Sequence, residues 1–80
     1  METSVLMQRW SLTMQQGMIT KWVKNEGERV NAGEIICYVE AEKVNIEVKS
    51  PVSGILIKIY TPEGATVPVE EVIAIISSEG

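Results

Sequence analysis

The sequence predicts an all-β domain, a small sandwich or flattened barrel with pseudo-twofold symmetry. Val, Ile and Thr recur in short runs, and Gly, Pro, Asn or a Glu-Gly pair closes each run, as is typical of strands separated by turns. No window of about 11 residues keeps the apolar spacing of an amphipathic helix. The two halves of the chain also repeat each other. With 80 residues, the chain is one domain at most, with a small core.

Each apolar run between turn residues is interpreted as one strand, in chain order. The predicted strands are residues 5–9, 18–23, 35–40, 44–49, 55–59 and 72–76, with two shorter pieces at 29–30 and 66–67. In the turns, Gly27 and Gly64 each follow a Glu, and we expect a positive φ at both. Residues 77–80, Ser-Ser-Glu-Gly, are interpreted as the start of a flexible linker.

An internal repeat becomes visible when the chain is shifted against itself by 37 positions. The residues that recur are Gly17, Lys21, Glu26, Gly27, Val30, Glu34 and Ile36, which align with Gly54, Lys58, Glu63, Gly64, Val67, Glu71 and Ile73. Neither half can bury its own apolar face, so we expect the two halves to pack against each other. Ile36 and Ile73 should therefore occupy equivalent places in the core.

The spacing Gly-x-apolar-x-x-apolar in both halves interrupts the period of two that a regular strand requires. It occurs at Gly17 with Ile19 and Trp22, and again at Gly54 with Leu56 and Ile59. A β-bulge, or a strand that crosses between sheets, explains the interruption. The alternative is that these strands are buried on both faces. Trp22 is expected in the core.

A hairpin is predicted between the two halves, because residues 38–48 form two alternating segments around a short polar break. The central pair, Glu42-Lys43, lacks the glycine or asparagine that favours a type I′ or II′ turn, so we expect a type I turn. Lys43 then projects from the outermost point of the domain. An exposed lysine is usually only a solvated charge, but a rigid hairpin tip also suits a side chain that another protein must reach and modify.

Composition excludes several classes of function. The net charge is −4, which argues against nucleic-acid binding, because phosphate contacts need a basic face. The chain has neither His nor Asp and a single cysteine, Cys37, so neither a Cys/His zinc site nor a Ser-His-Asp triad can form. Cys37 aligns with Ala74 in the repeat and is expected to be a buried, unreactive thiol. No apolar run reaches a membrane-spanning length, and we expect a soluble intracellular domain.

Several segments together resemble the biotinyl/lipoyl domain family, in particular the lipoyl domains of dihydrolipoamide acyltransferase (E2) components of 2-oxo acid dehydrogenase complexes. The hairpin run Val-Glu-Ala-Glu-Lys-Val at residues 39–44 is similar to the lipoyl-lysine hairpin. Residues 46–48, 50–54, 7–17, 26–30 and 63–69 extend the similarity to nearly the whole chain. The resemblance implies a flattened β-barrel, or barrel-sandwich hybrid, of two four-stranded antiparallel sheets.

The resemblance also implies that Lys43 bears lipoic acid in amide linkage, with Glu42 and Val44 flanking it in the turn. The family usually has Asp before this lysine and often Ala after it, so Glu42→Asp is expected to be neutral or mildly favourable for modification. Biotin carriers usually have Met on both sides of their lysine. Lipoate is therefore favoured over biotin, which stays the alternative cofactor.

In the family, the loop between the first two strands lies beside the hairpin and helps the decarboxylase (E1) to recognise its carrier. Leu12, Thr13 and Met14 of the segment at residues 11–16 are the recognition candidates that the resemblance implies. Leu12 and Met14 are candidate exposed apolar contacts, and a core-facing role for one of them is the alternative. Whether Trp10 is core or surface stays open.

The function that the resemblance implies is that of a carrier module rather than an enzyme. A lipoate-attaching enzyme would modify Lys43, and the arm would then visit E1, the E2 acyltransferase core and dihydrolipoamide dehydrogenase (E3). We expect a monomer with no catalytic residues, metal, nucleic-acid or membrane partner, located in the cytoplasm or, in a eukaryote, the mitochondrial matrix. The alternatives are a biotin carrier of a carboxylase or decarboxylase and an unmodified lipoyl-like structural module. Structural modules of that kind lack the lysine and interrupt the hairpin with a long insertion.

Overall fold

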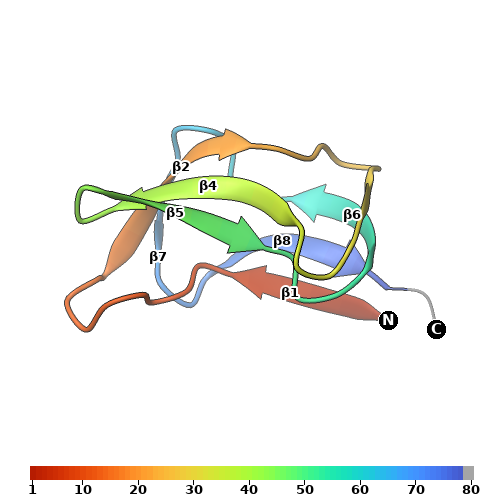
Figure 1. Ribbon diagram of the computed structural model, residues 1–80, viewed down its shortest axis with the longest axis horizontal. Helices are drawn as coiled ribbons and strands as arrows, with labels where there is room; N and C mark the ends of the chain where they lie inside the picture. Colours follow the sequence, from red (N-terminus) through yellow and green to blue (C-terminus); the bar gives the residue numbers. More distant parts are fainter. Residues whose placement is uncertain (79–80) are drawn as a thin grey trace.

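The computed structural model describes residues 1–78 as two packed four-stranded sheets (Figure 1). The eight strands are β1 (Glu2–Leu6), β2 (Gln16–Trp22), β3 (Arg29–Val30), β4 (Ile35–Ala41), β5 (Val44–Lys49), β6 (Gly54–Ile59), β7 (Thr66–Pro68) and β8 (Val72–Ser77). One sheet has the order β1-β8-β6-β3 and the other the order β5-β4-β2-β7, with every pairing antiparallel. The predicted flattened barrel of two four-stranded antiparallel sheets is confirmed.

The predicted strands are confirmed to within two residues, except for the first. That strand was expected at residues 5–9, whereas β1 ends at Leu6. The strand lies earlier in the chain because residues 2–6 pair with β8. Met7, the next residue, instead bonds to the segment after β7. Its N–H donates to the Glu71 carbonyl (2.9 Å), and its carbonyl accepts from the Glu70 N–H (2.7 Å). Apolar pattern alone does not reveal which residues have a neighbouring strand to pair with.

Pseudo-twofold symmetry extends to individual hydrogen bonds. The Glu26 carboxylate accepts from the Ile59 N–H (2.7 Å), and its repeat partner, Glu63, accepts from the Trp22 N–H (2.9 Å). Each half of the chain therefore satisfies a backbone donor of the other half. β1 and β5 occupy equivalent edges, because each flanks its sheet beside β8 or β4.

Matched β-bulges explain the interrupted alternation. The pairing of β2 with β4 shifts register between Ile19 and Lys21, and the pairing of β6 with β8 shifts between Leu56 and Lys58. The bulge interpretation is confirmed. The alternative of strands buried on both faces is wrong, since β2 exposes four residues and β6 exposes two.

The core lies between the two sheets and draws on both halves of the chain. Ile36 and Ile73 are both fully buried, as predicted, and so are the bulge neighbours Ile19 and Leu56. Trp22 is half-buried and packs against this core, while its Nε1–H donates to the Thr61 carbonyl (2.7 Å). At Gly54, a Cβ would lie 2.2 Å from the Ser77 carbonyl oxygen, so only glycine allows β6 to approach the end of β8 this closely.

The start of β1 and the end of β8 lie together, at the end of the molecule opposite to the β4–β5 hairpin (Figure 1). Ser77 is the last residue of β8, and the Ser78 N–H donates to the Met1 carbonyl (2.8 Å). The segment expected to begin a linker thus includes one strand residue and one residue hydrogen-bonded to the start of the chain. Glu79 and Gly80 lie outside the described residues.

Candidate functional site

The β4–β5 hairpin ends in a two-residue turn, because Ala41 pairs directly with Val44. Glu42 and Lys43 both have positive φ, 51° and 65°. These are the φ signs of a type I′ turn, so the predicted type I turn is wrong. A type I′ turn follows the right-handed twist of the two strands, which a type I turn would splay apart. The strand twist therefore outweighs the cost of about 1–2 kcal/mol for each non-glycine residue in this conformation.

Lys43 lies at the tip of this hairpin, and its side chain is exposed to solvent. Within residues 1–78 the ion pair that forms is Lys24 with Glu34, and Lys43 takes part in none. Val44, which follows, is 57% exposed, and Ala41 before the turn is buried. The predicted turn residues therefore present the Lys43 amine beyond the body of the sheet, accessible to another protein.

The β1–β2 loop reaches the hairpin tip through Glu42. The hydroxyls of Ser11 and Thr13 both donate hydrogen bonds to the Glu42 carboxylate, one to each oxygen. These bonds lower the pKa of the Glu42 carboxyl below its ordinary value, because they stabilise its charged form. The contact, which the sequence did not predict, joins two segments that lie far apart in the chain.

The three candidate recognition residues separate in the structure. Leu12 is 95% exposed and Thr13 is exposed, which fits a surface role. Met14 is only 1% exposed and belongs to the core, so the prediction that it is a surface contact is wrong, and the core-facing alternative is the one that holds for it. The Met14 carbonyl accepts from Arg9, and its sulfur faces the Trp10 N–H at 3.4 Å, which folds the loop around the buried side chain. Trp10 itself is partly exposed, at 38%.

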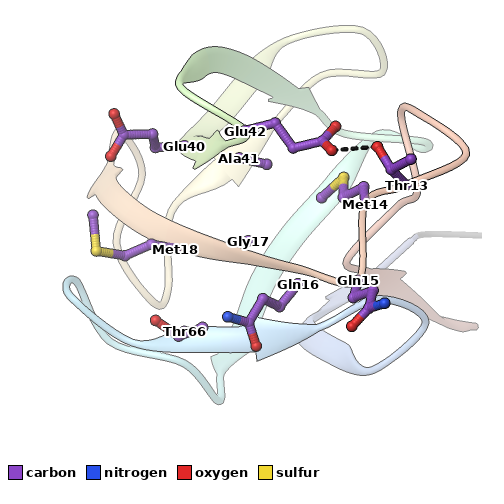
Figure 2. A pocket seen from close by; sticks show the side chains of 10 residues that line it. All are labelled: Thr13, Met14, Gln15, Gln16, Gly17, Met18, Glu40, Ala41, Glu42 and Thr66. Carbon is purple, nitrogen blue, oxygen red and sulfur yellow. Dashed lines mark hydrogen bonds between the residues drawn. The ribbon is translucent and has the colours of Figure 1, made fainter.

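A shallow pocket of about 390 Å³ lies beside the Glu42 contact (Figure 2). Residues of the β1–β2 loop, β2, β4, β7 and the hairpin turn line it: Thr13, Met14, Gln15, Gln16, Gly17, Met18, Glu40, Ala41, Glu42 and Thr66. Figure 2 shows the Glu42 side chain pointing along one rim toward Thr13. A Cβ at Gly17 would lie 2.7 Å from Val39 and 3.0 Å from Met7, so this glycine lets the loop and the hairpin strand approach each other.

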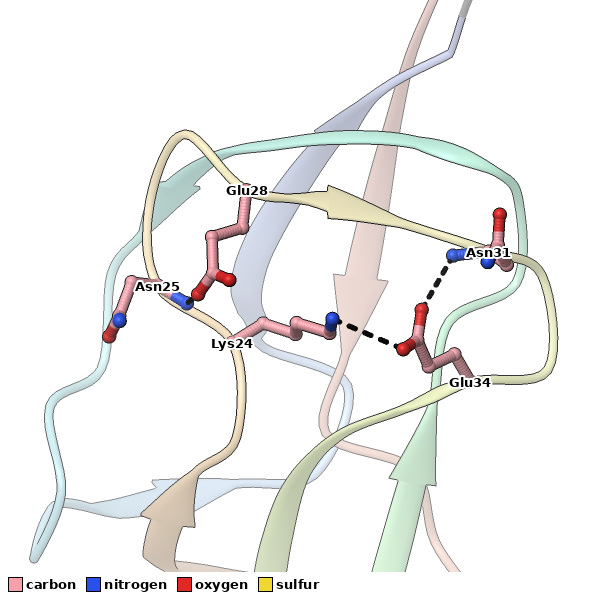
Figure 3. A network of polar contacts seen from close by, with 5 residues as sticks. All are labelled: Lys24, Asn25, Glu28, Asn31 and Glu34. Atoms are coloured by element: carbon pink, nitrogen blue, oxygen red, sulfur yellow. Dashed lines mark hydrogen bonds and ion pairs between the residues drawn. The ribbon is translucent and has the colours of Figure 1, made fainter.

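A network of polar contacts at the β2–β3 and β3–β4 turns has a structural role (Figure 3). Glu28 accepts from the Asn25 N–H (2.7 Å), and Glu34 accepts from the Asn31 N–H (2.9 Å) and pairs with Lys24 (3.1 Å). The Asn31 N–H first, and then Lys24, lower the pKa of the Glu34 carboxyl. These carboxylates stabilise turns and leave Lys43 as the candidate chemical group.

Other chemistry finds little support in residues 1–78. The described residues contain no cluster of three or more potential metal ligands. They also form no helix that is long and apolar enough to cross a membrane. Cys37 is fully buried, as predicted, and burial raises the pKa of its thiol to about 12. At neutral pH this thiol is a protonated core side chain and not a nucleophile.

The hairpin, its exposed lysine and the twofold barrel agree with a comparison against known families. Residues 4–76 match the biotin/lipoyl family, described as "Biotin-requiring enzyme". The chain belongs to the biotin/lipoyl family. Both cofactors named by this family are acids that attach to a lysine side chain as amides, and the exposed amine at the hairpin tip is the group that such a linkage requires.

Individual proteins similar to this biotin/lipoyl domain include components of dehydrogenase complexes and carboxylases. One relative is the dihydrolipoyllysine-residue acetyltransferase component of the pyruvate dehydrogenase complex from Rickettsia prowazekii. The two sequences are 43% identical over an alignment that covers 100% of this chain and 20% of the relative. The chain therefore spans about a fifth of the curated relatives that it matches.

Among solved structures, the lipoyl domain of the 2-oxoglutarate dehydrogenase complex from Azotobacter vinelandii is 28% identical, with a TM-score of 0.73 and coverage of 99% of this chain and 98% of that one. The urea carboxylase of Kluyveromyces lactis is 25% identical, with a TM-score of 0.82 over 96% of this chain and 6% of the enzyme. The fold is thus shared by lipoyl domains and by part of a carboxylase, and the residues of the tip must distinguish the two.

Proposed function

We propose that this domain is a lipoyl carrier, in which lipoic acid attached to Lys43 passes acyl groups and electrons between the active sites of a 2-oxo acid dehydrogenase complex. The observation that carries the proposal is the place of Lys43: an exposed amine on the two-residue turn of the β4–β5 hairpin, which lies at the end of the molecule opposite to the start of β1 and the end of β8. The similarity to a dihydrolipoyllysine-residue acetyltransferase component supports lipoate as the cofactor.

The residues at the tip fit an amide-linked cofactor. The amide forms when the deprotonated Lys43 Nζ attacks the carboxyl carbon of an activated lipoyl donor, releasing the donor's leaving group and one proton. Lysine is a cation at neutral pH, so a modifying enzyme must both deprotonate it and supply the activated donor. Lipoic acid supplies a dithiolane, whose disulfide accepts an acyl group and two electrons together.

The domain itself supplies tethering. The long axis of the molecule measures 37 Å, and the start of β1 and the end of β8 lie at the far end from the β4–β5 hairpin that bears Lys43. A tethered arm turns each later encounter into an intramolecular one with a high effective concentration. We propose a lipoate-attaching enzyme, E1, the E2 acyltransferase core and E3 as partners of a monomeric domain in the cytoplasm or, in a eukaryote, the mitochondrial matrix.

The first experiment tests the attachment site. After expression with lipoate and a lipoate ligase, the intact mass of the parent domain should increase by one lipoyl group, and Lys43→Ala should show no increase. Lys21→Ala and Lys58→Ala, which alter two other exposed lysines, are the controls and should be modified like the parent. Lipoylation of the Lys43→Ala variant at another lysine would refute the site. Because Lys43 is exposed, its removal should change the free energy of unfolding by no more than about 0.5 kcal/mol.

A biotin carrier is the second candidate, favoured by the similarity to a urea carboxylase and by the family description. Neither residue beside Lys43 is Met, which argues for lipoate. Co-expression with a biotin ligase, followed by a streptavidin blot beside an anti-lipoate blot, separates the two. We expect signal on the anti-lipoate blot alone, and streptavidin signal at parent Lys43 would favour biotin.

A further inference from the structure

The contact between Glu42 and the β1–β2 loop places an anchor directly beside the lysine. Ser11 and Thr13 donate to different oxygens of one carboxylate, and their own hydroxyl oxygens lie 3.3 Å apart. All three side chains are exposed, so core packing does not require them to meet. Two donors on alternate residues of a loop, aimed at one acceptor, restrain the loop and the turn relative to each other.

The contact of Glu42 with Ser11 and Thr13 restrains a turn whose backbone conformation is costly for its residues. Glu42 and Lys43 are consecutive residues with positive φ, and neither is glycine. L-residues adopt this conformation as isolated positions and at a cost, which the strand twist offsets, so a further restraint on the turn adds to its stability. Restraining the Glu42 side chain restrains the peptide bond that joins it to Lys43, and therefore the direction in which the lysine leaves the turn.

We propose that Glu42 is a positioning residue: through its bonds to Ser11 and Thr13 it holds the hairpin tip in one conformation, so that the enzyme that acylates Lys43 meets the amine in one orientation. This inference rests on the proposed function of the domain as a lipoyl carrier. An enzyme that binds a preordered tip avoids the entropic cost of ordering it on docking.

Glu42→Asp should behave differently in this chain from what the family resemblance implies. By resemblance, Glu42→Asp restores the commoner family residue and should be neutral or favourable. In this chain, an Asp from the same backbone position is one methylene shorter and would not reach both hydroxyls without moving the loop. Ser11, Thr13 and Glu42 thus form a matched set, and Glu42→Asp should weaken modification.

The first test uses the unmodified domain and does not depend on lipoylation. Backbone ¹⁵N relaxation should show residues 11–14 and 42–43 as rigid in the parent and more mobile in both Glu42→Ala and the double variant Ser11→Ala/Thr13→Val. Glu47→Gln, which removes an exposed charge from the same hairpin away from the turn, should match the parent. Unchanged relaxation in the double variant would overturn the proposal.

The second test measures lipoylation by a purified lipoate ligase as a time course of intact mass. Glu42→Asp, Glu42→Ala and Ser11→Ala/Thr13→Val should each lower kcat/KM by roughly 3- to 10-fold, as expected for losing one or two exposed bonds to a charged group, mainly by raising KM. The triple variant Ser11→Ala/Thr13→Val/Glu42→Ala should be no slower than Glu42→Ala or Ser11→Ala/Thr13→Val, because each of these two variants already removes the whole contact.

Other results separate the alternatives. A normal rate for Ser11→Ala/Thr13→Val with a slow Glu42→Ala would mean that the ligase reads Glu42 directly, and additive losses would mean that it contacts both segments independently. Either outcome overturns the positioning role while leaving Lys43 as the attachment site. If the parent itself is not lipoylated, the proposed function fails, whereas the relaxation test of the contact still stands.

Discussion

At the scale of single residues, burial decides which reactive groups are available. Cys37 and Lys43 are the two residues with nucleophilic side chains that the sequence analysis considered, and they differ in solvent exposure. Cys37 lies mid-strand in β4 with no solvent exposure, whereas Lys43 lies at the end of the same hairpin in open solvent. The Lys43 amine is therefore accessible to a modifying enzyme, whereas the Cys37 thiol is not.

Cys37 should be inert to thiol reagents in the native domain. Burial removes it from solvent and raises the pKa of its thiol to about 12, from an ordinary value of 9.0. Ellman's reagent at pH 8 should leave the native protein unmodified and label one thiol after denaturation in guanidinium. Rapid, stoichiometric labelling of the native domain would contradict the burial of this side chain.

The same shift predicts a loss of stability at high pH. Between about pH 9 and pH 12, the unfolded chain loses the thiol proton that the folded chain keeps, so the free energy of unfolding falls as the pH rises through this window. Chemical denaturation across this range should show a steeper fall for the parent than for Cys37→Ala, which carries the side chain of its repeat partner Ala74. Parallel curves for the two proteins would contradict the shift.

At the scale of one element, the pairing register of β4 and β5 sets the position of Lys43 at the hairpin tip. Ala41 pairs with Val44, and the alternation that follows places Val48 in the core. One residue inserted between Lys43 and Val44 must either enlarge the turn or slip the register, and a slip would turn Val48 outward. Lipoylation should therefore fall by roughly 10-fold or more, since small misplacements of a reacting group have large effects on rate.

The control for this insertion is one residue inserted between Ala32 and Gly33, in the turn between β3 and β4. That turn lies away from the hairpin tip, so it reports on general loss of stability (Figure 1). A ligase time course in which the hairpin insertion is modified as fast as the parent would show that presentation by the turn is not what the enzyme recognises.

At the scale of the whole molecule, the two halves contribute matched residues to one core. Ile36 and Ile73 are both fully buried at equivalent places in β4 and β8. Ile36→Ala and Ile73→Ala should each lower the free energy of unfolding by about 2–5 kcal/mol, enough to threaten a small domain. Urea denaturation measures this, with Ile57→Ala at a position 39% exposed as the milder control. Costs below about 1 kcal/mol at both buried positions would mean that the strand faces are misassigned.

The sequence by itself determined the fold class, the repeat, every strand but the first to within two residues, and the hairpin that presents Lys43; for the interrupted alternation it offered a β-bulge as one of several explanations. These follow from local signals: alternation of apolar residues, turn residues that close each run, and identical residues in the two halves. The buried isoleucines and Cys37 were predictable for the same reason, because a strand with a known face has a known inside. The resemblance of the segments around Lys43 added the candidate cofactor.

Only the tertiary structure decided the turn type, the end of β1, the core position of Met14 and the anchoring of Glu42 by Ser11 and Thr13. Each depends on which distant segments become neighbours. The twist of the paired strands selects positive φ at Glu42 and Lys43 although neither residue favours it. The loop brings its two hydroxyls to a carboxylate about 30 residues away, and no local pattern in the chain encodes that approach.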